Sequence, residues 1–302
     1  MESPPSATTP AASPSKRRVF FSRLTSTLVL WAVIGMAIQW KSQALFAGVA
    51  CFFGVAGAVE YFRLLVRHSQ PRSFSVFGLV VCLAYWTAVV WHVLTKRTEP
   101  PMWFDLAALT VAVQGAFLLC YRHELEGEAT LQRIFSVVFG VVYTVIFFGF
   151  IMRLMYFRAD GTELTGAFLM LYVIMVTKFS DMGAYAVGSL IGKHKMIPHI
   201  SPAKSWEGLG GAMLASTIAS VVLLATIPEK LAPLNWLHGM ILVPILVFVA
   251  VTGDLAESVI KRCLAIKDTG HKLPGIGGIL DLTDSLLFTA PIFYFYLSAI
   301  AR

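Results

Sequence analysis

Apolar residues recur along this chain in runs long enough to cross a lipid bilayer. A membrane-spanning helix needs about 20 mainly apolar residues. Nine segments come close to that length, over residues 24–40, 43–65, 74–94, 103–121, 134–152, 166–190, 209–227, 237–257 and 281–300. The pattern therefore predicts an all-α fold, a polytopic membrane bundle of about nine transmembrane helices joined by short connections.

The composition excludes one large soluble core. Hydrophobic residues make up 57% of the 302 residues, and charged residues only 14%. A soluble domain carries about 25% charged residues. The four cysteines show no metal-ligand spacing, so we interpret them as small apolar residues.

Three parts are expected along the chain. Residues 1–18 begin with a Ser/Pro/Thr/Ala-rich stretch that has too few apolar residues for a core, which predicts a disordered cytoplasmic tail. Residues 19–160 hold the N-terminal transmembrane helices. Residues 161–302 form the expected catalytic transmembrane domain, with loops at 191–206 and 258–280. A cleaved signal peptide is the competing interpretation of the first apolar run, but no small-residue cleavage site follows it cleanly.

The distribution of Lys and Arg predicts the orientation, because cytoplasmic loops carry the excess of these residues. With the N-terminus inside and the C-terminus outside, 16 basic residues fall inside and 7 outside, and one lies within a span. This N-in/C-out arrangement places both loops on the cytoplasmic side of the cell (inner) membrane. The net charge of +7 comes from residues scattered among short loops. It therefore indicates contact with membrane lipids or nucleotides and no nucleic acid.

A charged stretch at 253–285 separates two of the most apolar segments, and charge near a bilayer core marks a functional site by default. In a helix, Asp254, Glu257 and Lys261 share one face, with Ser258 and Arg262 beside them. Asp281 and Asp284 share a face at the first turn of the last helix. Carboxylates facing a basic, glycine-rich loop suit a divalent cation and the phosphates it bridges.

A second cluster lies at 177–208. Lys178 and Asp181 sit inside a membrane-length run, followed by a basic loop that includes Lys204. They could simply neutralise each other between helices, or they could share a site with the first cluster. Glu60, deep in the second span, needs a partner that the sequence does not name.

At these two clusters the sequence resembles phosphatidate cytidylyltransferases, also called CDP-diacylglycerol synthases. The family's C-terminal signature is matched at Ser258, Lys261, Arg262, Lys267, Asp268, Pro274, Gly277, Gly278, Asp281 and Asp284. Its upstream motifs are matched at Asp181, Gly183, Ala184, Tyr185, Gly192, Lys193, Lys195, Ser201, Pro202, Lys204, Trp206, Glu207 and Gly208.

The resemblance implies an enzyme that uses CTP and phosphatidic acid to make CDP-diacylglycerol and pyrophosphate for phospholipid synthesis. It implies Mg²⁺ on Asp281, Asp284 and Asp254, with Asp181 completing the site, and a second cation is compatible with the same residues. Asp254, Lys261, Asp281 and Asp284 are the expected catalytic residues. The expected substrate-binding residues are Lys178, Lys204, Ser258, Arg262, Lys267, Asp268, Lys272, Gly277 and Gly278. A homodimer is one assembly state that the sequence allows.

Two positions depart from the family signature. Ile276 replaces a histidine, and Leu282 replaces the arginine between the two aspartates. These departures keep open a catalytically weak, lipid-binding member of the family. An ion-coupled transporter is the alternative from another class, since intramembrane charges also mark ion paths.

Overall fold

The computed structural model of the chain describes residues 35, 43–67, 70–122, 124–157, 165–266 and 278–301. In these parts, eight helical rods are long and apolar enough to cross a membrane. Seven of them are the single helices α2 (Gln43–Arg67), α3 (Arg72–Lys96), α4 (Trp103–Cys120), α7 (Thr165–Ile191), α8 (Trp206–Thr226), α9 (Trp236–Cys263) and α10 (Ile279–Ile300). The eighth is continuous through α5 (Glu128–Val141), the π-helical turn η1 (Val142–Ile146) and α6 (Phe147–Tyr156). A short 3₁₀ turn, η2 (Pro228–Leu231), connects α8 to α9.

The predicted membrane bundle is confirmed, and eight of the nine expected spans match these rods. The first expected span at 24–40 and the expected disordered tail at 1–18 lie outside the described residues, except for residue 35. The fifth expected span was predicted to begin too late: the rod containing α5 begins at Glu128 rather than at residue 134.

The segment 191–206, expected to be a loop, contains a small β-hairpin. Strands β1 (Lys195–Ile197) and β2 (Ser201–Ser205) pair antiparallel, with Lys195 opposite Ser205. The hairpin leads directly into α8, whose first turn is capped by the Ser205 hydroxyl accepting a hydrogen bond from the Gly208 N–H at 3.2 Å. The all-α prediction therefore missed this one piece of sheet.

The other expected loop, 258–280, begins later than predicted. Helix α9 continues to Cys263, so residues 258–263 are helical. Lys261 and Arg262 occupy its last turn, where positive side chains interact favourably with the helix dipole.

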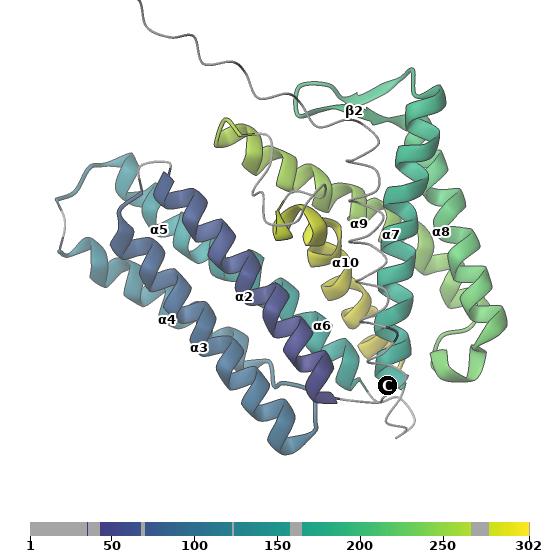
Figure 1. Cartoon of the computed structure of the whole chain (residues 1–302), viewed down its shortest axis with the longest axis horizontal. Coiled ribbons are helices and arrows are strands. Elements are labelled where there is room, and N and C mark those ends of the chain that lie inside the picture. Colours follow the sequence, from purple (N-terminus) through teal and green to yellow (C-terminus); the bar gives the residue numbers. More distant parts are fainter. Residues whose placement is uncertain are drawn as a thin grey trace, which may run out of the picture.

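The helices form two groups with α10 between them (Figure 1). Helices α2–α6 lie on one side and α7–α9 on the other, and α10 contacts α2, α6, α7 and α9. The hairpin projects at the end of the bundle where α7 and α9 end. The C-terminal helix is thus the centre of the fold, and its N-terminal end lies near the hairpin.

Two glycine contacts let helices that carry charge approach closely. A side chain at Gly183 of α7 would collide with the Gly211 carbonyl of α8, and the reverse also holds. A Cβ at Gly253 of α9 would lie 2.8 Å from the Asp284 carbonyl oxygen of α10. Small residues at such crossings allow backbones to touch within a membrane. The second crossing brings the aspartate that follows Gly253 next to Asp284.

Candidate active site

Three carboxylates converge where α9 crosses α10. Asp254 and Glu257 are three residues apart on α9 and therefore share a face, while Asp284 comes from α10. One ligand oxygen from each of the three lies within 4.8 Å of the others. We call Asp254, Glu257 and Asp284 the acidic triad.

Two members of the acidic triad are buried, while the Asp254 side chain is 38% exposed. Glu257 is 2% exposed and Asp284 is 6% exposed. Oδ1 of Asp284 accepts a hydrogen bond from the Ser285 N–H at 2.6 Å. Oε1 of Glu257 is buried and has no hydrogen-bond partner among the described residues. A buried carboxylate oxygen in that state is costly, and hard oxygen donors of this kind are the ligands of Mg²⁺. The residues present therefore fit a divalent cation.

Lys261 connects the triad to Asp281. Its ammonium lies 2.7 Å from Oε2 of Glu257 and 3.1 Å from Oδ1 of Asp281. The other oxygen of Asp281 accepts a hydrogen bond from the Gly278 N–H at 2.6 Å, which caps α10. Asp281 thus lies beside the triad and outside it, so its expected role as a metal ligand stays a prediction.

Asp181 and Lys178 join the site from α7. Oδ1 of Asp181 accepts a hydrogen bond from the Ser285 hydroxyl at 3.2 Å, and its Oδ2 lies 3.3 Å from Nζ of Lys178. The same Nζ donates to the Leu282 carbonyl at 2.9 Å. Lys178 and Asp181 thus pair within α7 rather than between helices. Their further hydrogen bonds to Leu282 and Ser285 connect α7 to α10 next to the triad.

The hairpin is held against α9 by two basic side chains. Nζ of Lys204 lies 2.5 Å from Oδ2 of Asp254 and donates to the Val251 carbonyl at 3.0 Å. Arg262 donates from Nε to the Ile200 carbonyl at 3.3 Å, at the turn of the hairpin. Both expected phosphate-binding residues thus lie at the hairpin–α9 junction.

A cavity of about 730 Å³ opens between α7, the hairpin, α9 and α10. Its lining includes the predicted site residues Asp181, Asp254, Asp281, Asp284 and Lys204. Lys193 and Lys195, which belong to the matched upstream motifs, also line it. Binding sites for small molecules commonly measure about 300–1,000 Å³. The cavity is therefore large enough for a nucleotide beside the carboxylates.

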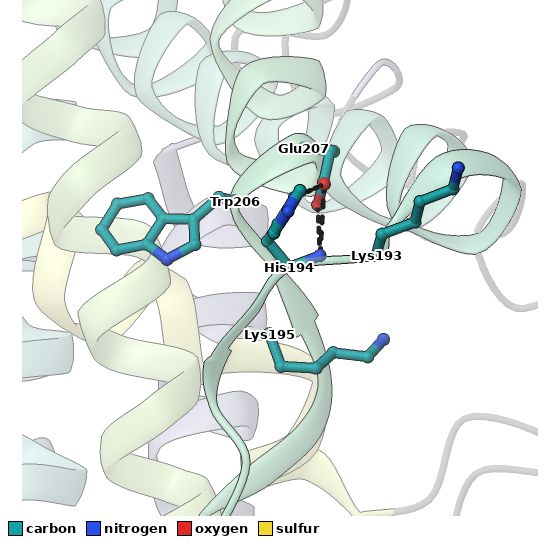
Figure 2. A pocket seen from close by; sticks show the side chains of 5 residues that line it. All are labelled: Lys193, His194, Lys195, Trp206 and Glu207. Atoms are coloured by element: carbon teal, nitrogen blue, oxygen red, sulfur yellow. Dashed lines mark hydrogen bonds and ion pairs between the residues drawn. The ribbon is translucent and has the colours of Figure 1, made fainter.

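A second, shallower hollow lies on the outer side of the hairpin, at the start of α8. Figure 2 shows His194 and Glu207 pointing toward each other, while Lys193 and Lys195 extend away from them. Nδ1 of His194 lies 2.6 Å from Oε1 of Glu207, and the His194 N–H donates to the same carboxylate at 3.2 Å. Glu207 thus fixes the start of β1 relative to α8, and it is the one acidic side chain among the described residues that line this hollow.

Glu60 has a partner that sequence analysis did not find. Oε2 of Glu60, on α2, accepts a hydrogen bond from the Ile279 N–H at 2.8 Å. Ile279 is the first residue of α10, so Glu60 helps to cap the helix that carries Asp281 and Asp284. The N-terminal half of the bundle therefore contributes directly to the site.

The remaining expected residues divide into described and undescribed positions. Ser258 is half-buried on α9, one position beyond Glu257, and Gly278 precedes α10. Lys267, Asp268, Lys272 and Gly277 lie outside the described residues. Glu257 is the member of the triad that was not predicted as a ligand, although its helical spacing from Asp254 was the available signal.

Comparison with known proteins shows which family the chain is similar to. A family model described as "Cytidylyltransferase family" matches residues 21–300. The chain is 32% identical to "Uncharacterized protein YnbB" of Escherichia coli (strain K12), over 91% of this chain and 96% of that protein. It is 31% identical to the phosphatidate cytidylyltransferase of Bacillus subtilis (strain 168), over 80% and 86%. It is 41% identical to the phosphatidate cytidylyltransferase of Staphylococcus haemolyticus (strain JCSC1435), over 74% and 78%.

Proposed function

Since the chain belongs to the cytidylyltransferase family, we propose that it transfers the cytidylyl group of CTP to phosphatidic acid. The products are CDP-diacylglycerol and pyrophosphate. One observation carries the proposal: Asp254 and Asp284 of the acidic triad line a nucleotide-sized cavity together with several lysines, inside a bundle of membrane helices. Phosphatidic acid from the membrane and CTP from the aqueous phase could both reach this cavity.

The reaction places few demands on protein chemistry beyond charge and position. An oxygen of the phosphatidic acid phosphate forms a bond to the α-phosphorus of CTP. The bond from that phosphorus to the oxygen bridging it to the β-phosphorus breaks, and pyrophosphate leaves with that oxygen. Because the attacking phosphate is already anionic, no general base is needed. Positioning and electrostatic stabilisation are the main contributions in phosphoryl transfer.

The triad supplies the residues that would hold Mg²⁺. Asp254, Glu257 and Asp284 offer oxygens from two helices whose spacing is fixed at the Gly253 crossing. Mg²⁺ bound there would neutralise charge on the triphosphate. Asp281 would act by keeping Lys261 and the start of α10 in place, and a role as a direct ligand remains a prediction for it.

The basic residues divide by what they contact. Lys204 and Lys261 lie beside triad carboxylates, and Arg262 lies at the hairpin junction, so these three would hold phosphates. Lys178 is already engaged with Asp181 and the Leu282 carbonyl. We assign Lys178 to positioning α10 in preference to the substrate contact expected from sequence.

The hairpin and the C-terminal end of α9 lie at the same end of the bundle, as the Arg262–Ile200 hydrogen bond requires. We place this end on the cytoplasmic side of the inner membrane, where CTP is found, in agreement with the positive-charge bias. A second cation and a homodimer remain predictions.

Purified full-length protein in lipid nanodiscs, given CTP and phosphatidic acid with and without Mg²⁺, tests the proposal. We expect CDP-diacylglycerol to form only with Mg²⁺, and we expect Asp284→Asn to lower the rate of its formation about a hundredfold or more. The matched control is Asp105→Asn, which alters a carboxylate paired with Arg153 and far along the chain from the triad. Absence of product from folded protein that binds both substrates would contradict the proposal and favour a lipid-binding role.

A further inference from the structure

A buried tyrosine from the N-terminal half packs against α10 close to the acidic triad. Tyr143 belongs to the π-helical turn η1 and is 1% exposed. Its hydroxyl is buried and has no hydrogen-bond partner among the described residues. π-Helical turns are rare and frequently occur at functional sites, and a buried hydroxyl without a partner is costly. The π-helical turn and the buried hydroxyl together indicate a functional role for Tyr143.

Two aromatic contacts fix the Tyr143 ring. It stacks on Phe139 with centroids 5.3 Å apart and an interplanar angle of 14°. Its edge meets Phe288 of α10 at a centroid distance of 6.3 Å. Phe288 lies one helical turn after Asp284, on the same face of α10. The ring therefore rests on α10 immediately beside the triad.

The residue that Tyr143 contacts on α10 also borders the triad. A Cβ at Gly253, next to Asp254, would lie 3.1 Å from the Phe288 ring and 2.8 Å from the Asp284 carbonyl oxygen. Glu257 lacks a hydrogen-bond donor for one of its oxygens, since its Oε1 is a buried acceptor without a partner in the described part of the chain. A donor and an acceptor that both lack partners there thus lie in the same buried region.

We infer that Tyr143 is a positioning residue of the acidic triad, its hydroxyl donating a hydrogen bond to the triad carboxylates through one water. The inference rests on the proposed cation site. Hydrogen bonds to metal-binding carboxylates orient them, and losing one commonly lowers metal affinity by about 10- to 100-fold. Tyr143 would thereby connect the N-terminal helices to cation binding.

Tyr143→Phe tests this inference because it removes only the hydroxyl. Full-length protein in detergent micelles is stripped of divalent cations with EDTA, and its Tm is then followed during titration with MgCl₂. We expect the Mg²⁺ midpoint of the Tm increase to rise about tenfold in Tyr143→Phe, with the Tm in EDTA close to that of the wild type. Tyr85→Phe is the matched control. It also removes a buried hydroxyl, which donates to Asp105 at 2.8 Å, and it should leave the midpoint unchanged.

A second variant, Phe139→Leu, keeps the inference testable if Tyr143→Phe does not fold. Phe139→Leu keeps the hydroxyl and removes the ring on which Tyr143 stacks, at a side chain that is 44% exposed. It should raise the Mg²⁺ midpoint by less than Tyr143→Phe. A wild-type midpoint in Tyr143→Phe, or in Phe139→Leu if Tyr143→Phe does not fold, would overturn the inference. A wild-type Tm that does not respond to Mg²⁺ would also overturn it. Wild-type protein that binds Mg²⁺ yet makes no CDP-lipid would refute the proposed reaction and leave the inference standing.

Discussion

Replacing Glu60 tests whether α2 supports the site from a distance. Glu60 is 4% exposed, and its carboxylate accepts a hydrogen bond from the Ile279 N–H at 2.8 Å. A hydrogen bond to a charged group contributes about 1.5–3 kcal/mol. Glu60→Ala removes the acceptor and leaves a buried N–H at the start of α10. Glu60→Gln keeps an acceptor oxygen and loses only the charge.

We expect Glu60→Ala to favour local opening of the first turn of α10 by about 2 kcal/mol. That free energy corresponds to an increase of about 30-fold in the opening equilibrium. Hydrogen–deuterium exchange measures it directly, as faster exchange at residues 279–285, with α4 as the internal control. Activity with CTP and phosphatidic acid should fall in parallel, because Asp284 is carried by the loosened turn. Glu60→Gln should recover most of both.

Wild-type exchange at the start of α10 in Glu60→Ala would refute this reasoning, since the capping bond would then contribute nothing. Equal effects of Ala and Gln would show that the charge of Glu60 matters and the hydrogen-bond acceptor does not. Uniformly faster exchange, in α4 as well as in α10, would indicate general destabilisation of the bundle.

Three further predictions concern other parts of the site. Asp284→Asn should lower the rate of the reaction about a hundredfold or more. In the MgCl₂ titration, Asp281→Asn, which perturbs the cap of α10 and Lys261, should raise the Mg²⁺ midpoint by less than Asp284→Asn does. Equal increases in the two variants would place Asp281 among the metal ligands. Lys178→Met should lower the free energy of unfolding by about 1–2 kcal/mol, because Asp181 and the Leu282 carbonyl lose their cation; a Tm and activity equal to wild type would contradict the role in positioning α10. The introduced thiol of Lys193→Cys should resist an impermeant maleimide added to intact cells and react after lysis, and labelling from outside would reverse the proposed orientation.

The membrane bundle could be predicted because hydrophobic run length alone identifies spanning helices. The hairpin could not, because strand β2 reads Ser-Pro-Ala-Lys-Ser and has no alternation of apolar and polar residues. Its strands are held by the junction with α9 and by the Glu207 contact, which are tertiary features. The extension of α9 past residue 257 was missed for a related reason, since charged residues resemble a loop until their partners are known.

The site could be predicted as a region and not as a set of ligands. Helical spacing placed Asp254 and Glu257 on one face, but it could not decide which carboxylates of α10 meet them. That choice depends on the Gly253 crossing and on Lys261, which bridges Glu257 and Asp281. The contact between Glu60 and Ile279 joins residues 219 positions apart, and a single sequence carries no signal for such a pair.

The ion pair within α9 has a consequence for biosynthesis. Lys261 lies four residues after Glu257 on the same helix, with their charged groups 2.7 Å apart. Helix α9 is synthesised before α10, so it must enter the bilayer before any contact with α10 can form. Because the helix carries its own counter-charge, a carboxylate that would oppose insertion is neutralised from the outset. Loss of Lys261 should therefore reduce the amount of protein that reaches the membrane, and the activity of such variants is meaningful only per inserted molecule.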